Sequence, residues 1–161
     1  MNNYSKISEL FDVHYGVNLE LVNLEQCSMN DIDAMPFVSR TEKNNGVSAY
    51  VYKHIDITPN PGNTISVAGG GSVLSSFFQP IPYYSGRDLY FLVPKIKMNV
   101  IEMLFYAKCI EANKYRFNYG RQANRTLRDL LIPSKMPNEF QKIEVPLIKS
   151  LNDSIRLFEK K

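Results

Sequence analysis

The sequence of 161 residues contains few of the residues from which catalytic and metal sites are usually built. It has two histidines, His14 and His54, and two cysteines, and none of them has a partner at metal-ligand spacing. Cys27 and Cys109 lie far apart, so we expect reduced core thiols rather than a disulfide. No apolar run approaches the roughly 18 residues of a membrane-spanning helix, and the N-terminus lacks a signal-peptide pattern. We therefore expect a soluble, cytoplasmic protein without a membrane partner.

Motifs of catalysis and nucleotide binding are also missing. The run Gly69–Gly71 is not followed by Gly-Lys-Ser/Thr, and the dinucleotide spacing breaks at Leu74. No nucleophile elbow occurs, and the carboxylates are scattered rather than paired as acid and base. We interpret the three glycines as positions of unusual backbone angles or of close approach to another backbone. The sequence thus predicts a protein that is not an enzyme and binds no cofactor or metal of its own.

Charge is unevenly distributed along the chain. Residues 1–34 carry a net charge of −5, and residues 35–161 carry a net charge of +8. The formal total of +3 therefore hides a basic surface, which suits a polyanionic partner.

Short β-prone runs separated by turn residues fill the middle of the chain. The predicted strands cover 37–41, 47–52, 64–68, 73–78 and 88–93. Before them, residues 5–18 mix a short helical pattern with a break at Tyr15-Gly16, and residues 19–24 fit either a strand or a helix end. After them, helices are predicted over 99–115 and 124–131. The apolar residues expected to face the core from the first of these helices are Met98, Ile101, Leu104, Phe105 and Cys109.

This pattern predicts an α+β domain whose twisted, largely antiparallel central β-region is flanked by helices. We expect the domain to cover residues 1–137, followed by a short spacer-type helical segment over 138–161. Ile148, Leu151, Ile155 and Phe158 in this tail follow the a/d spacing of a coiled-coil seam, which suggests assembly with a partner. A C-terminal helix that packs on its own domain explains the spacing equally well.

Basic, aromatic and amide side chains are concentrated between Lys108 and Arg128, where Glu111 is the only acidic residue. Arginine can fork onto guanine or phosphate, asparagine and glutamine can pair with adenine, and lysine attracts phosphate. The alternative is that some of these arginines stack on tyrosines or cap the flanking helices. Two further polar loops, at 39–45 and 82–87, share this chemistry, and three such loops on one scaffold indicate a binding face.

Four segments then carry a resemblance to a known family: 36–41, 44–47, 61–67 and 84–88. They resemble target recognition domains of Type I restriction-modification specificity subunits, in particular the BcgI-like branch. The segment 115–121 and its continuation to Leu131-Ile132-Pro133 resemble the end of that family's domain.

The resemblance implies a non-catalytic subunit that binds one half of a bipartite double-stranded DNA sequence and positions methyltransferase and restriction subunits on it. S-adenosylmethionine, ATP and Mg²⁺ would belong to those partner subunits. The residues that we expect to contact DNA are Arg40, Thr41, Lys43, Asn44, Asn45, Tyr84, Ser85, Arg87, Asn118, Tyr119, Arg121, Gln122, Asn124 and Arg125.

Full-length family members have two recognition domains separated by long helices, whereas this chain has one domain and the start of one helix. Either it pairs with a copy of itself as a half-subunit, or it is a recognition domain cut from a larger protein. As an alternative function, an orphan half-subunit could join a restriction-modification complex and change or block its specificity. Enzymatic activity is expected only of a longer parent polypeptide in which a nuclease and a methyltransferase are fused.

Overall fold

The computed structural model describes residues 3–117, 123–142 and 153. The strands within these residues are β1 (Tyr4–Lys6), β2 (Phe11–Tyr15), β3 (Gln26–Cys27), β4 (Ala34–Val38), β5 (Val47–Tyr52), β6 (Thr64–Ala68), β7 (Ser76–Gln79), β8 (Tyr84–Ser85), β9 (Leu89–Pro94) and β10 (Leu131–Pro133). The α-helices are α1 (Ile7–Leu10), α2 (Val100–Glu111) and α3 (Asn138–Gln141), and the 3₁₀ helices are η1 (Leu21–Asn23), η2 (Asn44–Gly46), η3 (Lys114–Phe117) and η4 (Leu127–Asp129).

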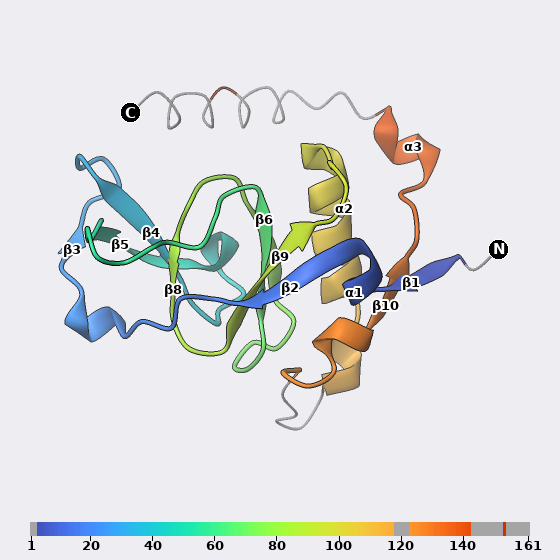
Figure 1. Ribbon diagram of the computed structural model, residues 1–161, viewed down its shortest axis with the longest axis horizontal. Helices are drawn as coiled ribbons and strands as arrows, with labels where there is room; N and C mark the ends of the chain where they lie inside the picture. Colours follow the sequence, from blue (N-terminus) through green and yellow to red (C-terminus); the bar gives the residue numbers. More distant parts are fainter. Residues whose placement is uncertain (1–2, 118–122, 143–152, 154–161) are drawn as a thin grey trace.

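Two four-stranded sheets form the centre of the molecule (Figure 1). One has the strand order β2-β9-β6-β7 and is antiparallel throughout. The other has the order β3-β5-β4-β8, in which only β8 runs parallel to its neighbour. β1 and β10 form a separate antiparallel pair. The predicted α+β class with a largely antiparallel β-region is confirmed.

All five residues of β6 are buried. It pairs with β7 on one side and with β9 on the other, so its backbone groups are satisfied on both edges. The run Thr-Ile-Ser-Val-Ala combines β-branched and small side chains, which suit a position covered on both faces. The sequence prediction of a buried strand over 64–68 is confirmed with the same bounds.

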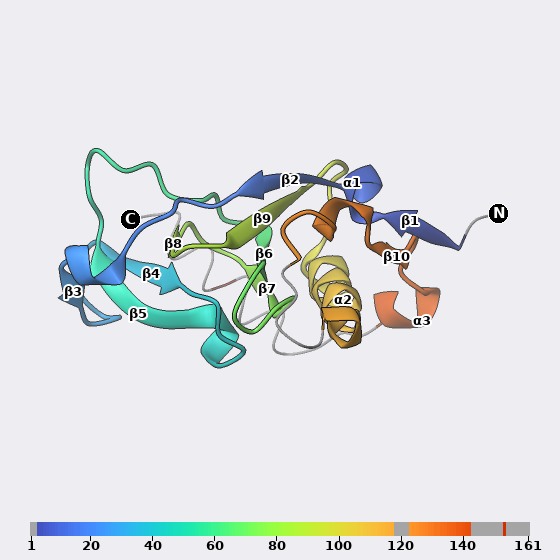
Figure 2. The same ribbon diagram turned by 90° about the horizontal axis from the view of Figure 1, so that it is seen from below.

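α2 begins at a capping box, in which the Asn99 side chain accepts from the Glu102 amide and the Glu102 carboxylate accepts from the Asn99 amide. The helix packs on β7 and β6, and Figure 2 shows it on one side of this sheet, with β4 and β5 on the other side. The helix is shorter than the predicted span of 99–115, because it ends at Glu111. None of the described helices is long and apolar enough to cross a membrane.

The predicted core-facing side of this helix was only partly right, because Met98, Phe105 and Cys109 pack against the core from partly buried positions. Its buried residues are Met103, Tyr106, Ala107 and Ile110. Leu104 is exposed, and the other four predicted residues, Met98, Ile101, Phe105 and Cys109, are only partly buried. Apolar residues lie on nearly every side of this helix, so periodicity alone does not select the side that meets the sheet.

The predicted helix over 124–131 was wrong. This segment forms the short helix η4 and then enters β10, which pairs with β1 at the other end of the chain. Such a pairing between segments distant in sequence is invisible to a local pattern. Residues 19–24, which fit either element, form the 3₁₀ helix η1.

The main core lies between the β2-β9-β6-β7 sheet and α2 and includes Phe11, Ile65, Leu92 and Ile110. A second cluster, with Met35, Phe37, Val51 and Tyr84, is formed by side chains of the other sheet. A third, smaller cluster includes Tyr83. Residues 143–152 and 154–161, including the predicted seam of Ile148, Leu151, Ile155 and Phe158, lie outside the described residues, so the domain boundary at 137 stays a prediction.

Candidate nucleic-acid interface

Four chain segments meet at the three consecutive glycines between β6 and β7. The Gly69 amide donates to the Asp88 carbonyl (2.8 Å), and the Ala123 amide donates to the Gly69 carbonyl (3.0 Å). The Ser72 amide donates to the Arg40 carbonyl (3.4 Å). We call this meeting point of Arg40, Gly69–Gly71, Asp88 and the segment 123–125 the loop junction.

The glycines permit this close approach. A Cβ atom on Gly69 would lie 2.8 Å from the Tyr90 ring, which is too close for any packed pair of carbon atoms. Gly71 has a φ of +62°, in the left-handed region that favours glycine. A Cβ on Gly71 would also lie 3.1 Å from the Arg40 carbonyl oxygen, so unusual backbone angles and close approach to another backbone are both confirmed for the glycine run.

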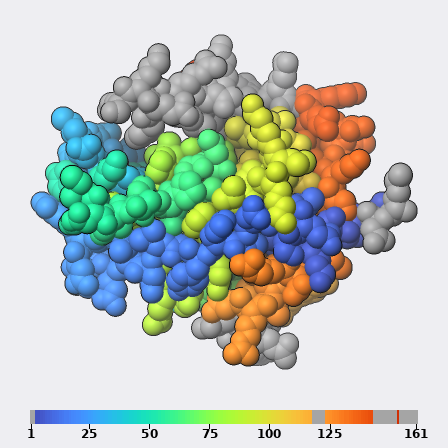
Figure 3. All heavy atoms as spheres, viewed as in Figure 1, coloured from blue at the N-terminus to red at the C-terminus, as the bar shows by residue number. Residues whose placement is uncertain are grey.

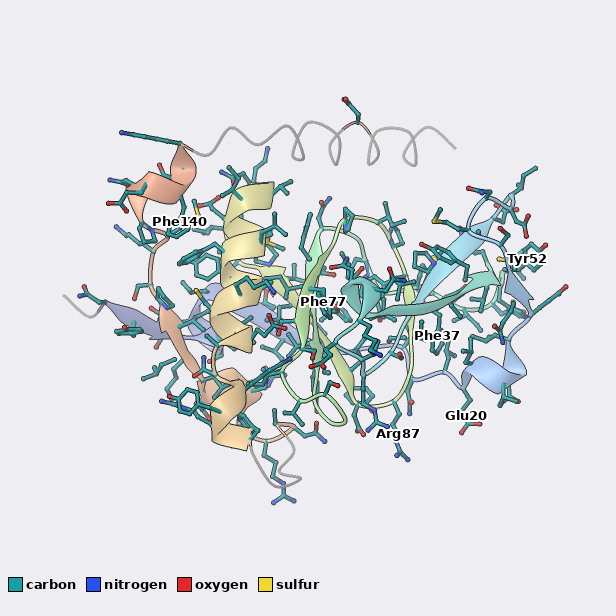
Figure 4. All side chains as sticks on the ribbon, turned by 180° about the vertical axis from the view of Figure 1, so that it is seen from behind. Glu20, Phe37, Tyr52, Phe77, Arg87 and Phe140 are labelled. Carbon is teal, nitrogen blue, oxygen red and sulfur yellow. The ribbon has the colours of Figure 1, made fainter. Side chains whose placement is uncertain are left out.

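Three of the loops at the junction lie along one edge of the molecule. The β6–β7 loop, the β8–β9 loop and the segment leading to η4 are at the lower edge in Figure 1. In Figure 3 the lime-coloured β8–β9 loop and the orange segment after residue 122 both project at that edge. Figure 4 shows the Arg87 side chain pointing outward there. Side chains from these loops are thus presented to solvent on a common side.

The structure distributes the predicted contact residues over three environments. Lys43, Asn44, Asn45, Arg87 and Arg125 are exposed, and Arg40, Thr41 and Asn124 are partly buried. Tyr84 and Ser85 are fully buried. Asn118, Tyr119, Arg121 and Gln122 lie outside the described residues.

Burial removes Tyr84 and Ser85 from the candidate set, which corrects their predicted role. The Tyr84 hydroxyl accepts from the His54 amide (3.0 Å) and lies 3.2 Å from the carbonyls of His54 and Ile57. The Ser85 hydroxyl donates to the Val17 carbonyl (2.8 Å) and accepts from the Asn60 amide group (2.8 Å). Both hydroxyls therefore tie loops to the second sheet, and neither side chain has surface to offer a DNA strand.

Arg40 and Arg87 converge on one carboxylate. Arg40 Nη1 donates to Asp88 Oδ2 at 3.0 Å, and Arg87 Nε lies 3.6 Å from the same oxygen. The side chains of Arg40 and Asp88 are 30% and 17% exposed, whereas that of Arg87 is 71% exposed. One arginine is thus held in place, and the other extends into solvent.

The loop between β4 and β5 is shaped by its own polar groups. The Lys43 amide donates to the Thr41 hydroxyl (3.2 Å), and the Asn44 amide group donates to the Val47 carbonyl (2.9 Å). Asn45 donates to the Phe78 carbonyl (3.2 Å). Asn44 and Asn45 have φ values of +48° and +54°, which asparagine tolerates better than most residues. These amide groups fold the loop, and Lys43 carries its exposed positive charge.

The end of α2 is joined to this loop by Lys114, which lies 3.6 Å from Glu42 and 3.4 Å from Glu111. Partial burial raises the pKa of the Glu111 carboxyl, but the hydrogen bond from Lys108 and the charges of Lys108 and Lys114 outweigh burial, so that the net pKa is lowered. Arg116 stacks against the neighbouring Tyr115 ring, with 5.7 Å from its guanidinium carbon to the ring centroid.

Structural roles take up part of the basic stretch between Lys108 and Arg128. Arg128 Nη2 donates to the Val13 carbonyl (2.7 Å), and Lys108 pairs with Glu111 (2.6 Å). The alternative interpretation, in which arginines of this stretch stack on tyrosines or cap helices, thus holds for Arg116, whereas Arg128 and Lys108 make other structural contacts.

Positive charge remains in excess around the loop junction. Among the described residues, the basic side chains of its loops and of the adjoining ion pairs are Arg40, Lys43, Arg87, Lys114 and Arg125, and the acidic ones are Glu42, Asp88 and Glu111. The residues predicted to contact DNA did not include Asp88, Gly70 or Lys114. Asp88 directly follows Arg87, but only the fold places its carboxylate against Arg40, 48 residues away.

The remaining groups with chemical potential have structural surroundings. Within the described residues, no cluster of three or more His, Cys, Asp or Glu residues could hold a metal ion. His14 stacks on Phe91, with 4.9 Å between the ring centroids. Both cysteines are free and partly buried, and burial raises the pKa of the Cys109 thiol to about 11.

Comparison with known proteins agrees with this architecture. The chain is 25% identical over 134 residues to the Type II restriction enzyme BgcI specificity subunit S.BcgI of Heyndrickxia coagulans, covering 81% of this chain and 37% of that protein. The S subunit of a Type-I restriction-modification system from M. genitalium has a similar fold, with a TM-score of 0.60, 15% identity, and 98% of this chain and 40% of that chain covered. The HsdS subunit from Thermoanaerobacter tengcongensis gives a TM-score of 0.61 at 12% identity, covering 98% of this chain and 39% of that chain.

The chain thus spans about two fifths of the length of these relatives. At sequence level, residues 2–160 match the family described as Type I restriction modification DNA specificity domain. Because this match covers nearly the whole sequence, the chain belongs to the family of Type I restriction modification DNA specificity domains.

Proposed function

We propose that this chain binds double-stranded DNA sequence-specifically, as the specificity component of a restriction-modification system. The observation that carries the proposal is the convergence of basic loops at the loop junction, where Arg40 is anchored by Asp88 and the exposed Arg87 lies beside the same carboxylate. Arginine and lysine supply phosphate attraction, and oriented arginine also reads guanine in the major groove. Membership of the specificity-domain family supports a DNA target.

The chain length supports one recognition unit rather than a whole specificity subunit. Coverage of 37% to 41% of each relative fits one of the two recognition domains that the resemblance implies. In this proposal the chain reads half of a bipartite site. Methyltransferase and restriction subunits bring S-adenosylmethionine, ATP, Mg²⁺ and the chemistry.

Selection from a library of duplexes with a randomised central segment tests the DNA-binding proposal. The selected duplex and a random duplex are then titrated at several salt concentrations. We expect the selected duplex to bind more tightly by a factor that approaches the 10³ or more of specific DNA-binding proteins. A preference below about tenfold would refute specific recognition, because non-specific phosphate attraction then accounts for the binding.

The absence of catalysis is tested on the same protein. Incubation of the purified chain with the selected duplex, Mg²⁺ and S-adenosylmethionine should leave the DNA unmethylated and uncut. Turnover that persists in a preparation of the pure chain would contradict a purely binding role.

A second candidate function is that of an interaction protein, an orphan half-subunit that joins a restriction-modification complex and alters its specificity. The a/d spacing of Ile148, Leu151, Ile155 and Phe158 favours it. Leu151→Asp with Ile155→Asp should abolish assembly with a partner, measured by light scattering, while the unfolding temperature stays the same. Unaltered assembly of this double variant would refute the seam.

A further inference from the structure

We propose that Arg40 is a specificity-determining residue of the loop junction, and that Asp88 and Gly70 are positioning residues that hold its guanidinium in one orientation. The inference rests on the proposed DNA-binding function and adds to it which arginine reads a base and what aligns it. Its recognition partner is the guanine edge of a base pair.

The guanidinium of Arg40 is fixed at one end and available at the other. Its Nη1 donates to Asp88 Oδ2 at 3.0 Å, and the side chain remains 30% exposed. A guanidinium has five N–H donors in a rigid fork, and one hydrogen bond to Asp88 leaves most of them for a ligand.

The backbone of Asp88 is itself held by two hydrogen bonds. Its amide donates to the Tyr15 hydroxyl (2.8 Å), and its carbonyl accepts from the Gly69 amide (2.8 Å). Its φ of +55° lies in the left-handed region, so the backbone turns sharply at this residue. The carboxylate that receives Arg40 therefore has a position set by β2 and by the glycine loop, and not by its own flexibility.

The loop Gly69–Gly71 packs directly against the Arg40 side chain. A Cβ on Gly70 would lie 2.9 Å from Arg40 Nη1, and a Cβ on Gly71 would lie 3.0 Å from Arg40 Cβ. Any side chain at Gly70 would therefore compete with the guanidinium for its place beside Asp88. The missing side chain at Gly70 and the Asp88 carboxylate together restrict the Arg40 guanidinium to one position.

Arg87 shares the same carboxylate but not this confinement. It lies 3.6 Å from Asp88 Oδ2, and its side chain is 71% exposed. Phosphate attraction requires only a positive charge near the backbone, whereas bidentate reading of guanine requires an aligned fork. The difference in confinement assigns base reading to Arg40 and phosphate attraction to Arg87.

The first test compares Arg40→Lys with Arg87→Ala on the duplex selected by the wild-type chain and on a random duplex. Arg40→Lys keeps the charge and loses the fork, so affinity for the selected duplex should fall by about 5- to 150-fold, the worth of one bidentate base contact. Affinity for the random duplex should stay within about twofold, as expected for a phosphate-driven term. Arg87→Ala should weaken both duplexes equally and reduce the slope of log K against log salt by about 0.9.

The second test changes no charge. Gly70→Ala should displace the guanidinium and cause the same selective loss as Arg40→Lys. Gly86→Ala is the matched control, because its added Cβ would meet the Phe37 ring at an ordinary 3.6 Å. Thermal unfolding of each variant separates a folding defect from a recognition defect, and Arg40→Lys remains decisive if Gly70→Ala does not fold.

The outcomes distinguish this inference from the proposed function. If the wild-type chain selects no sequence, the proposed function fails and this inference fails with it. If the wild type selects a sequence and Arg40→Lys binds the selected and random duplexes as the wild type does, only the assignment of Arg40 is overturned. If Arg40→Lys lowers specificity but a folded Gly70→Ala does not, the positioning role of the glycine loop is overturned.

Discussion

Replacing Tyr84 with phenylalanine tests whether this residue holds the fold together or contacts DNA. The Tyr84 hydroxyl is buried and accepts from the His54 amide at 3.0 Å, with two carbonyl oxygens at 3.2 Å. Removal of the hydroxyl therefore deletes one accepted bond and at least one donated bond. Each such bond contributes about 0.5–1.5 kcal/mol net, so the expected loss is about 1–3 kcal/mol in the free energy of unfolding.

Urea unfolding at neutral pH measures this loss, and thermal unfolding should show a decrease of about 2–4 °C for each kcal/mol. Tyr50→Phe is the matched control: Tyr50 is a partly buried residue of β5 whose hydroxyl makes no hydrogen bond within the described residues, so this change should stay within about 0.5 kcal/mol. Affinity of Tyr84→Phe for the selected duplex, measured well below the unfolding temperature, should equal that of the wild type. Weakened DNA binding at unaltered stability would refute the structural role and return Tyr84 to the contact surface.

Three smaller predictions concern the scaffold. Asn99→Ala removes the capping box of α2 and should cost about 1 kcal/mol in urea unfolding; no loss would mean that tertiary packing alone sets the start of the helix. The lowered pKa of Glu111 stabilises the fold above the carboxyl's ordinary pKa, and this contribution disappears as pH falls through the lowered value. Between neutral and acidic pH, Glu111→Gln should therefore lose less free energy of unfolding than the wild type does. An equal loss would contradict the ion-pair explanation. Burial raises the pKa of the Cys109 thiol to about 11, so a thiol reagent at pH 8 should label Cys27 first in the native chain, and equal rates would argue against that burial.

Local patterns predicted two strands with their bounds. The strands Val47–Tyr52 and Thr64–Ala68 match the sequence expectation, because β-prone runs between turn residues are local signals. The C-terminal end of α2 could not be predicted from local patterns. Asn99 marks its start as a capping residue, but no comparable signal showed that the helix stops at Glu111.

The candidate site was predictable as a set of loops but not as a geometry. Arg40 and Arg87 lie in polar, turn-forming segments, and both reach the loop junction. Tyr84 and Ser85, from the same kind of segment, are buried because β8 pairs with β4. A Tyr-Tyr-Ser run between turn residues has the same composition whether it faces solvent or packs under a sheet.

The sequence by itself determined the β-rich class, the uneven charge and the scarcity of residues for catalysis, since each depends on composition or short-range order. Only the tertiary structure decided which side of α2 meets the sheet and which polar side chains make hydrogen bonds inside the fold. It also decided that Arg40 donates a hydrogen bond to Asp88 while packing against Gly70 and Gly71. These contacts join segments far apart in the chain, and their geometry depends on how the sheets and loops pack together rather than on any local preference.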